Sequence, residues 1–201
     1  MNSKHLINIS KFFSELSMYR RAIRSGPKLA GLNFEEQLSA HVVRAAQIAY
    51  ILAYLEKADP EKSACLVLFH DNGELRVGDQ NKVSARYFNI DKAEKKAFNE
   101  QNECLPESIK ITLRSYYDQF DNRTSKEGII AREADWLEAA IFAKEMTEIG
   151  YKGMQNWIEN VKKALHTQSA KEILAYIEKY PDFTNSWWQG LKKMAIKKIK
   201  K

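Results

Sequence analysis

The chain has 201 residues, of which 44% are hydrophobic and 29% are charged. This is the ordinary balance of a soluble globular protein, and the length suits one domain or two small ones. The 8 glycines and 4 prolines are few, which favours long helices over a turn-rich β fold. Cys65 and Cys104 form neither a disulfide framework nor a CxxC metal site. With no signal-peptide pattern and no stretch of roughly 20 apolar residues, we expect a cytoplasmic protein without a membrane partner.

The net charge of +6 is concentrated at the C-terminus. Residues 191–201 contain six lysines and no acidic residue, and without them the basic residues equal the 26 acidic ones. Such a run is usually a solvated tail, so the charge does not predict a nucleic-acid polymer as partner. We therefore divide the chain into one domain, residues 1–190, and a lysine-rich tail, residues 191–201.

Three helices are expected in the first third of the chain. The first covers about residues 7–23 and ends at the breaker Arg24-Ser25-Gly26-Pro27. The second covers about residues 34–57, with an apolar stripe at steps of three and four residues. The third begins with Asp59 as N-cap and Pro60 in the first helical position. Its residues 64–69 are apolar on every side, so we expect this helix to be central and buried.

The remaining segments also have helical patterns. Two polar helices are expected at about residues 92–103 and 106–117. Thr124-Ser125-Lys126-Glu127 has the spacing of a capping box and opens a long helix that continues to about residue 149. Two more helices are expected near residues 154–165 and 170–180. Because no segment alternates as a strand does, the sequence predicts an all-α fold in a single domain.

The most informative motif is His70-Asp71-Asn72-Gly73-Glu74, where the apolar helix ends. Burying charged groups without partners is costly, so such a cluster should be paired or metal-bound. Glu74, three residues beyond Asp71, returns to nearly the same helix face. The motif thus offers two metal ligands and one carboxylate able to contact a water. The structural alternative is that His70 merely caps its helix or bonds to a backbone carbonyl.

Two further polar residues lie on predicted helices. His41 precedes Val42 on the buried stripe, and a satisfied core histidine is the alternative explanation for it. Asp135 lies among small and apolar residues, with a surface ion pair to Arg132 as its alternative. Together with the His70-Asp71 pair, they make a set of two imidazoles and two carboxylates. Such a set suits Mn, Fe, Co, Ni or Zn rather than Mg or Ca alone.

The pattern H…HD…D, here His41, His70-Asp71 and Asp135, resembles the signature of the HD-domain metal-dependent phosphohydrolases. The closer resemblance is to their 5'-deoxynucleotidase branch, the YfbR- and HDDC2-like proteins. It extends over about residues 24–165. Further elements that carry it are Glu74, Val77-Gly78-Asp79, Arg86-Tyr87-Phe88-Asn89 and Asp135-Trp136-Leu137-Glu138.

The resemblance implies an HD-domain helical bundle and a role for each site residue. The divalent transition metal would be held by His41, His70, Asp71 and Asp135, and Glu74 would be the catalytic carboxylate. The implied substrate contacts are Arg24, Asp79, Gln80, Asn81 and Lys82. The branch often has a Trp after this Arg and a Glu before the first histidine, where this chain has Pro27 and Ala40. These differences leave the metal ligands in place and bear on the substrate preference.

The resulting hypothesis is hydrolysis of (deoxy)nucleoside 5'-monophosphates to nucleoside and phosphate, by an enzyme that the resemblance implies to be a homodimer. The metal would lower the pKa of a bound water from 15.7 toward about 7, and Glu74 would orient or deprotonate it, or relay a proton. One alternative is an HD hydrolase of a nucleoside triphosphate, a cyclic nucleotide or ppGpp. Another is a non-catalytic nucleotide-binding module whose surface includes Trp187-Trp188 and the tail. Core packing is the outcome we expect for these two tryptophans.

Overall fold

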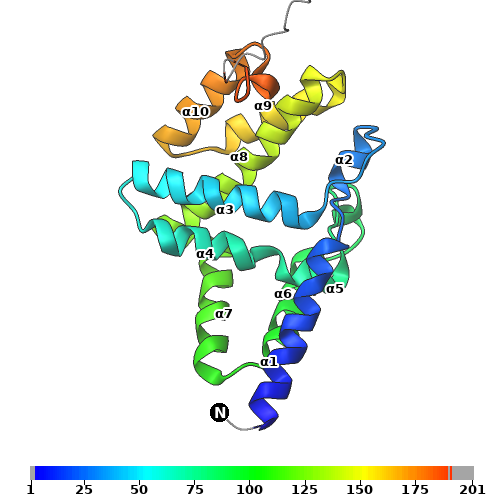
Figure 1. Ribbon diagram of the computed structural model, residues 1–201, viewed down its shortest axis with the longest axis vertical. Helices are drawn as coiled ribbons and strands as arrows, with labels where there is room; N and C mark the ends of the chain where they lie inside the picture. Colours follow the sequence, from blue (N-terminus) through cyan, green and yellow to red (C-terminus); the bar gives the residue numbers. More distant parts are fainter. Residues whose placement is uncertain (1–2, 190, 192–201) are drawn as a thin grey trace, which may run out of the picture.

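The computed structural model describes residues 3–189 and 191, and this part of the chain is built from helices (Figure 1). The α-helices are α1 (Ser3–Leu16), α2 (Gly26–Leu29), α3 (Leu38–Leu55), α4 (Pro60–His70), α5 (Glu74–Val77), α6 (Ile90–Asn102), α7 (Glu107–Asn122), α8 (Lys126–Glu148), α9 (Gln155–Ala164) and α10 (Gln168–Lys179). Short 3-10 turns are η1 (Ser17–Arg20), η2 (Asp71–Gly73), η3 (Ser84–Arg86), η4 (Lys152–Met154) and η5 (Phe183–Asn185). Apart from one isolated bridge between Ile23 and Gln37, no β-structure occurs among the described residues. The all-α prediction is confirmed.

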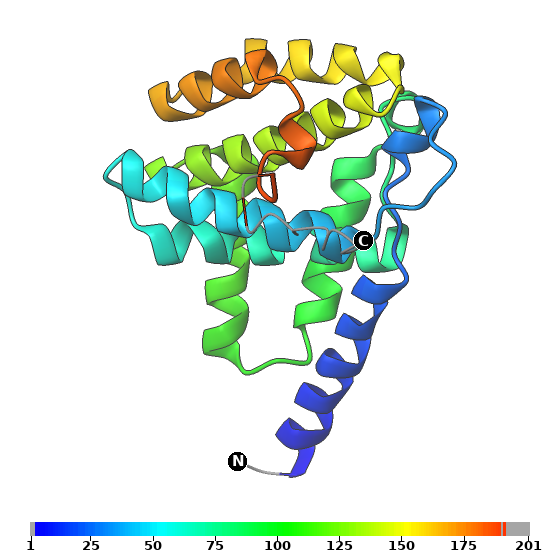
Figure 2. The ribbon, with the colours of Figure 1, turned by 45° about the horizontal axis from the view of Figure 1, so that its top comes forward.

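The core lies where α3, α4 and α8 pack on one another, which Figures 1 and 2 show from two directions. Its contact surfaces are rich in alanine, and small side chains let helix axes approach closely. The alanines buried there are Ala45, Ala46, Ala49 and Ala53 on α3 and Ala131, Ala134, Ala140 and Ala143 on α8. This packing holds the middle of α3, the end of α4 and the middle of α8 at fixed distances.

Two groups of helices extend from this core in opposite directions (Figure 1). At one end, α1, α6 and α7 surround a second apolar cluster that includes Phe12, Phe98 and Tyr117. At the other end, α9 packs along α8, and α10 follows it. Glu133 of α8 accepts hydrogen bonds from the backbone N–H of Thr167, at the start of α10. The N-terminus of α10 is therefore capped from another helix.

By length and composition, α3 is also the one described helix that could cross a membrane. The core helix of a soluble protein passes the same test. Here Ala45, Ala49 and Leu52 of α3 are buried in the main cluster beside Leu66 of α4 and Leu137 of α8. We therefore assign α3 to the core of the bundle.

The start of α4 confirms the predicted cap. The Asp59 side chain accepts from the Lys62 N–H at 3.0 Å, and Pro60 is the first helical residue. The burial prediction for this helix was wrong in part, because Leu66 and Val67 are fully buried while Leu68 is 42% exposed. Only one side of α4 faces α3 and α8, so its apolar surface exceeds what those helices cover.

The start of α8 corrects the predicted capping box by one residue. The cap is Ser125, whose hydroxyl accepts from the Gly128 N–H at 3.0 Å, and not Thr124. Ser125 has the extended backbone that an N-cap needs, with φ −132° and ψ 164°. The prediction placed the pairing one residue too early because Thr124 and Ser125 both have capping side chains.

The tryptophan pair also differs from expectation. Trp187 is 75% and Trp188 51% exposed, so neither is a core residue. They follow η5, whose Phe183 and Thr184 backbone N–H groups donate to Glu148. This anchor fixes η5 against the end of α8, and the pair beyond it lies on the surface.

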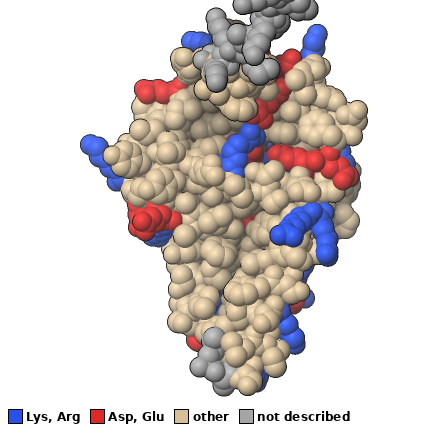
Figure 3. Space-filling model, viewed as in Figure 1, with Lys and Arg blue, Asp and Glu red and all other residues tan. Residues whose placement is uncertain are grey.

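Charged side chains of both signs are interspersed on the face that Figure 3 shows, and neither sign forms a continuous patch there. This agrees with the expectation that the body of the chain is balanced in charge. Apart from Leu191, the predicted lysine-rich tail lies outside the described residues, and the boundary at residue 190 stays a prediction.

Candidate metal centre

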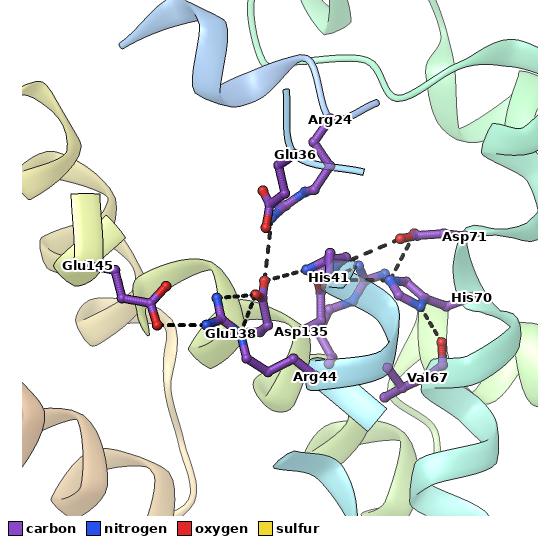
Figure 4. Close-up of polar contacts among 11 residues, drawn as sticks. Arg24, Glu36, His41, Arg44, Val67, His70, Asp71, Asp135, Glu138 and Glu145 are labelled. Carbon is purple, nitrogen blue, oxygen red and sulfur yellow. Dashed lines mark hydrogen bonds and ion pairs between the residues drawn. The ribbon is translucent and has the colours of Figure 1, made fainter. Parts of the chain in front are cut away.

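Four side chains from three distant parts of the sequence meet in the core (Figure 4). His41 comes from α3, His70 ends α4, Asp71 begins η2, and Asp135 lies in the middle of α8. His41 Nε2 lies 3.1 Å from Asp135 Oδ1 and 3.8 Å from Asp71 Oδ2. His70 Nε2 lies 2.8 Å from Asp71 Oδ1 and 3.9 Å from Asp135 Oδ1. The structure thus brings together all four residues that the sequence singled out as ligands.

Both imidazole rings are oriented by a contact at the opposite nitrogen (Figure 4). His41 Nδ1 is hydrogen-bonded to Glu138, and His70 Nδ1 is hydrogen-bonded to the Val67 carbonyl oxygen at 2.6 Å. A donor bond at Nδ1 leaves the Nε2 lone pair free, which is the usual arrangement of a ligating histidine. Each Nε2 points at the two aspartates.

The electrostatics of the cluster favour a positive charge at its centre. Burial raises the pKa of the Asp71 carboxyl, but His70 and His41 outweigh burial and hold the pKa below its usual range. The pKa of Asp135 is likewise lowered, against burial, by its hydrogen bond to His41 and by His70. Burial and Arg24 lower the pKa of His41, yet the hydrogen bonds to Asp135 and Glu138 raise it to about 10. The buried carboxylates of Asp135 and Glu138 therefore favour a proton on His41, or a cation in the place of that proton.

These residues fit a divalent metal. Ligand atoms of His41, His70 and Asp71 all lie within 4.8 Å of one another, and Asp135 joins them through both histidines. Mixed imidazole and carboxylate donors are typical of Mn, Fe, Co, Ni and Zn sites. The oriented rings and the buried, ionised carboxylates are what such an ion requires.

His41, His70, Asp71 and Asp135 line a cavity of about 430 Å³, the metal-side cavity. Glu74 lies in the wall of the same cavity. Its Oε2 is buried and has no hydrogen-bond partner within the described part of the chain. Burial raises the pKa of Glu74 well above its usual value, and the charges of Asp71, Asp79 and Glu94 raise it further. A carboxyl with this environment can hold or move a proton near neutral pH.

Gly73 explains how Glu74 reaches this wall. A Cβ added at Gly73 would lie 2.5 Å from the Glu94 carbonyl oxygen, so only glycine lets η2 pack so closely on α6. The contact also brings the Glu94 side chain to the cavity. Burial, followed by the charges of Asp71, Asp91 and Asp79, raises the pKa of Glu94 to about 7.

The five predicted substrate contacts surround two adjoining cavities. The metal-side cavity and a second one of about 570 Å³ share Arg24, Asp79, Gln80, Lys82 and Asp135 in their walls. Asn81 lines the second cavity and donates to the Ser25 hydroxyl at 3.3 Å, while Asp79 accepts from the Ser25 backbone N–H. These bonds tie the segment after α5 to the segment before α2. Pro27 is buried beside this segment.

Arg24 is held in place by carboxylates. Its Nη1 lies 3.1 Å from Glu36 Oε2 and 3.4 Å from Glu138 Oε2, at the junction of the two cavities. Glu138 also pairs with Arg44 at 2.6 Å, so it connects His41 to two arginines (Figure 4). The sequence reasoning missed this role of Glu138, although its position three residues after Asp135 on one helix was a usable signal. No motif in the sequence around Glu36 or Glu94 indicates that these residues lie at the site.

The arrangement can be compared with known proteins. The sequence model of the HD-domain family matches residues 16–182 of this chain. The chain belongs to the HD-domain family. This HD-domain chain is 25% identical over 190 residues to a 5'-deoxynucleotidase of Erwinia tasmaniensis, covering 88% of this chain and 94% of that one. It is 24% identical over 150 residues to the human 5'-deoxynucleotidase HDDC2, covering 72% of this chain and 71% of that protein.

A solved structure has the same fold. It is described as a predicted metal-dependent phosphohydrolase from Magnetospirillum magnetotacticum, is 16% identical, covers 87% of this chain and 91% of its own, and gives a TM-score of 0.68. The HD-domain fold and the family predicted from the sequence are confirmed, as is the class of metal-dependent phosphohydrolase. The HD-domain chain carries a His-His-Asp cluster that can hold a metal ion.

Proposed function

We propose that this HD-domain protein hydrolyses (deoxy)nucleoside 5'-monophosphates to nucleoside and phosphate. The observation that carries the proposal is the meeting of two histidines and two aspartates at the floor of a cavity that opens into a second, more apolar one. The first cavity suits a phosphate beside a metal, and the second has room for a nucleoside. The proposal is also supported by relatives named 5'-deoxynucleotidases.

In this proposal His41, His70, Asp71 and Asp135 hold one divalent transition metal, with Co, Mn, Fe, Ni and Zn as the candidate ions. A bound ion of this kind lowers the pKa of a water toward about 7 and polarises a phosphoryl oxygen. Glu138 acts as a positioning residue, because it orients His41 through Nδ1. Its negative charge also keeps Arg24 beside the site.

The protein's own side chains move the proton and balance the charge. Glu74 takes a proton from the attacking water, or returns one to the leaving 5'-oxygen, because its buried carboxyl has a raised pKa. Arg24 and Arg132 line the metal-side cavity and offset the charge of the phosphate. Asp79, Gln80, Asn81 and Lys82 contact the sugar and base side, because all four line the second cavity.

We further propose a homodimer in the cytoplasm. Exposed apolar side chains lie along the outer surface of α3, where a second copy could cover them: Val43, Tyr50, Ile51, Tyr54 and Leu55. Light scattering of the purified protein tests the dimer, and a monomeric mass at micromolar concentration would exclude it.

The decisive experiment for the function is a phosphate-release assay. Purified protein is analysed for bound metal and then assayed with Mn²⁺ or Co²⁺ on nucleoside 5'-monophosphates, triphosphates and cyclic nucleotides. We expect metal-dependent release from monophosphates, and loss of both metal and release in Asp135→Asn. Release from the other esters alone would favour a different substrate class, and no release from any of them would leave a binding module as the function.

A further inference from the structure

The second cavity is lined on one side by a single face of α9. Four residues of α9 line this cavity: Trp157 and, three, four and seven positions after it, Asn160, Val161 and Ala164. This spacing places them on one face of the helix. Ala139 of α8 lies in the wall as well, and small side chains at Ala139 and Ala164 leave the space open. On this side the cavity is a slot bounded by Trp157, by Asn160 and by aliphatic groups.

The Trp157 ring is held against the start of α2. A Cβ added at Gly26 would lie 2.7 Å from Trp157 Cη2 and 3.3 Å from Cζ2, so the indole edge contacts the backbone of Gly26 directly. Gly26 is adjacent to Ser25, whose backbone N–H donates to Asp79. This contact connects the ring to the segment that carries Arg24.

A second tryptophan, Trp136, also lines the slot, but its ring has a partner of its own. The Arg123 guanidinium lies 5.9 Å from the ring centroid of Trp136. Trp157 instead belongs to the residues packed against the main core and lines the cavity. Of the two, Trp157 is the better platform for a ligand.

We propose that Trp157 is a specificity-determining residue that packs against the nucleobase of the substrate. The inference rests on the proposed function and names the part of the substrate that is recognised. The phosphate end is fixed where the cavities share Arg24 and Asp135, so the remainder of a nucleotide extends toward the slot of about 570 Å³. Any nucleobase gains contact area by stacking on an indole, so Trp157 would distinguish a nucleotide from a phosphate ester that lacks a base. Gln80 and Asn160 provide polar groups at the wall of the slot.

The test separates base recognition from phosphate chemistry. Binding of deoxyadenosine to metal-free protein is measured by calorimetry, because this needs neither metal nor turnover. In parallel, kcat/KM with Mn²⁺ is compared for deoxyadenosine 5'-monophosphate and for 2-deoxyribose 5-phosphate, which lacks a base. The variants are Trp157→Ala and Trp157→Phe, and the matched control is the exposed Trp187→Ala, which lies outside the cavity.

We expect Trp157→Ala to weaken deoxyadenosine binding about tenfold or more, and to lower the preference for the nucleotide over the baseless ester by a similar factor. Trp157→Phe should keep most of both, and Trp187→Ala should match the wild type. Trp157→Leu, which keeps apolar bulk against Gly26, replaces the alanine variant if that does not fold.

Equal deoxyadenosine affinity in wild type and Trp157→Ala would overturn the inference while leaving the phosphatase intact. So would a wild type that binds no deoxyadenosine and hydrolyses both esters with the same kcat/KM. If no phosphate is released from any nucleotide, the proposed function fails, and the binding comparison decides the role of Trp157 by itself.

Discussion

At the scale of single residues, the site separates two carboxylates with lowered pKa values, Asp71 and Asp135, from two carboxyls with raised ones, Glu74 and Glu94. Asp71 and Asp135 have lowered pKa values because each lies beside two imidazoles. Glu74 has a raised pKa because it is buried among carboxylates and its Oε2 has no partner within the described chain. Such a divergence between neighbouring carboxyls is how proteins assign acid and base roles.

The variant Glu74→Gln tests this assignment. It keeps the size of the side chain and removes only its ability to carry a proton, so metal content should be unchanged while kcat falls by about 100- to 10,000-fold. Bound metal and steady-state turnover measured on the same preparation provide the check. A variant as active as the wild type would remove Glu74 from the mechanism.

At the scale of elements, the site depends on how the chain leaves α4. His70 ends this helix, η2 carries Asp71, and α5 begins at Glu74, so three of the proposed site residues lie within five positions. The turn fits against α6 only because Gly73 has no side chain. The position of Glu74 is thus set by contact between η2 and α6.

Gly73→Ala should therefore displace η2 from α6, with a loss of about 1–3 kcal/mol in the free energy of unfolding. Turnover should fall as well, because Glu74 and Glu94 move with these segments. The matched control is Gly153→Ala, where an added Cβ would meet only the Ala30 Cβ at 3.9 Å. Denaturant unfolding and phosphate release for both variants decide the matter, and an unchanged Gly73→Ala would refute the close-packing argument.

At the scale of the whole molecule, one ion would connect the three central helices. The proposed ligands come from α3, from the end of α4 with η2, and from α8, so a metal that binds only the folded chain would stabilise their packing. The site is also coupled to pH. The hydrogen bonds to Asp135 and Glu138 raise the pKa of His41 to about 10 against burial, so a metal bound at the proposed site would displace a proton from this ring.

Saturating metal, at 100 times its Kd, should add about 2.7 kcal/mol of stability and raise Tm by roughly 5–10 °C. A chelator should reverse the increase, and Asp135→Asn should show little of it. Because binding releases the His41 proton, the apparent metal affinity should decrease as the pH is lowered. Thermal melts at several pH values with and without metal measure both effects, and a metal-independent Tm would contradict this account.

What the sequence alone determined is local. The helices follow from patterns a few residues long, and the Asp59-Pro60 start of α4 was correct because capping needs only neighbours. The grouping of His70, Asp71 and Glu74 was visible for the same reason. His41 and Asp135 stood out as polar residues on predicted helices, and the family signature connected them to that group. The structure places both beside it, and their role as ligands stays a prediction.

Only the tertiary structure decided how distant segments share an environment. Burial of Glu138 against His41, the contact of Gly73 with Glu94, and the ring of Trp157 beside Gly26 each join positions from separate helices. The same holds for the exposed Trp187 and Trp188, whose apolar character alone favoured the core. Spacing along a chain determines which side chains share one helix face, but packing between helices determines which faces contact each other. The shifted pKa values and the cavities of this protein arise from those contacts between helices.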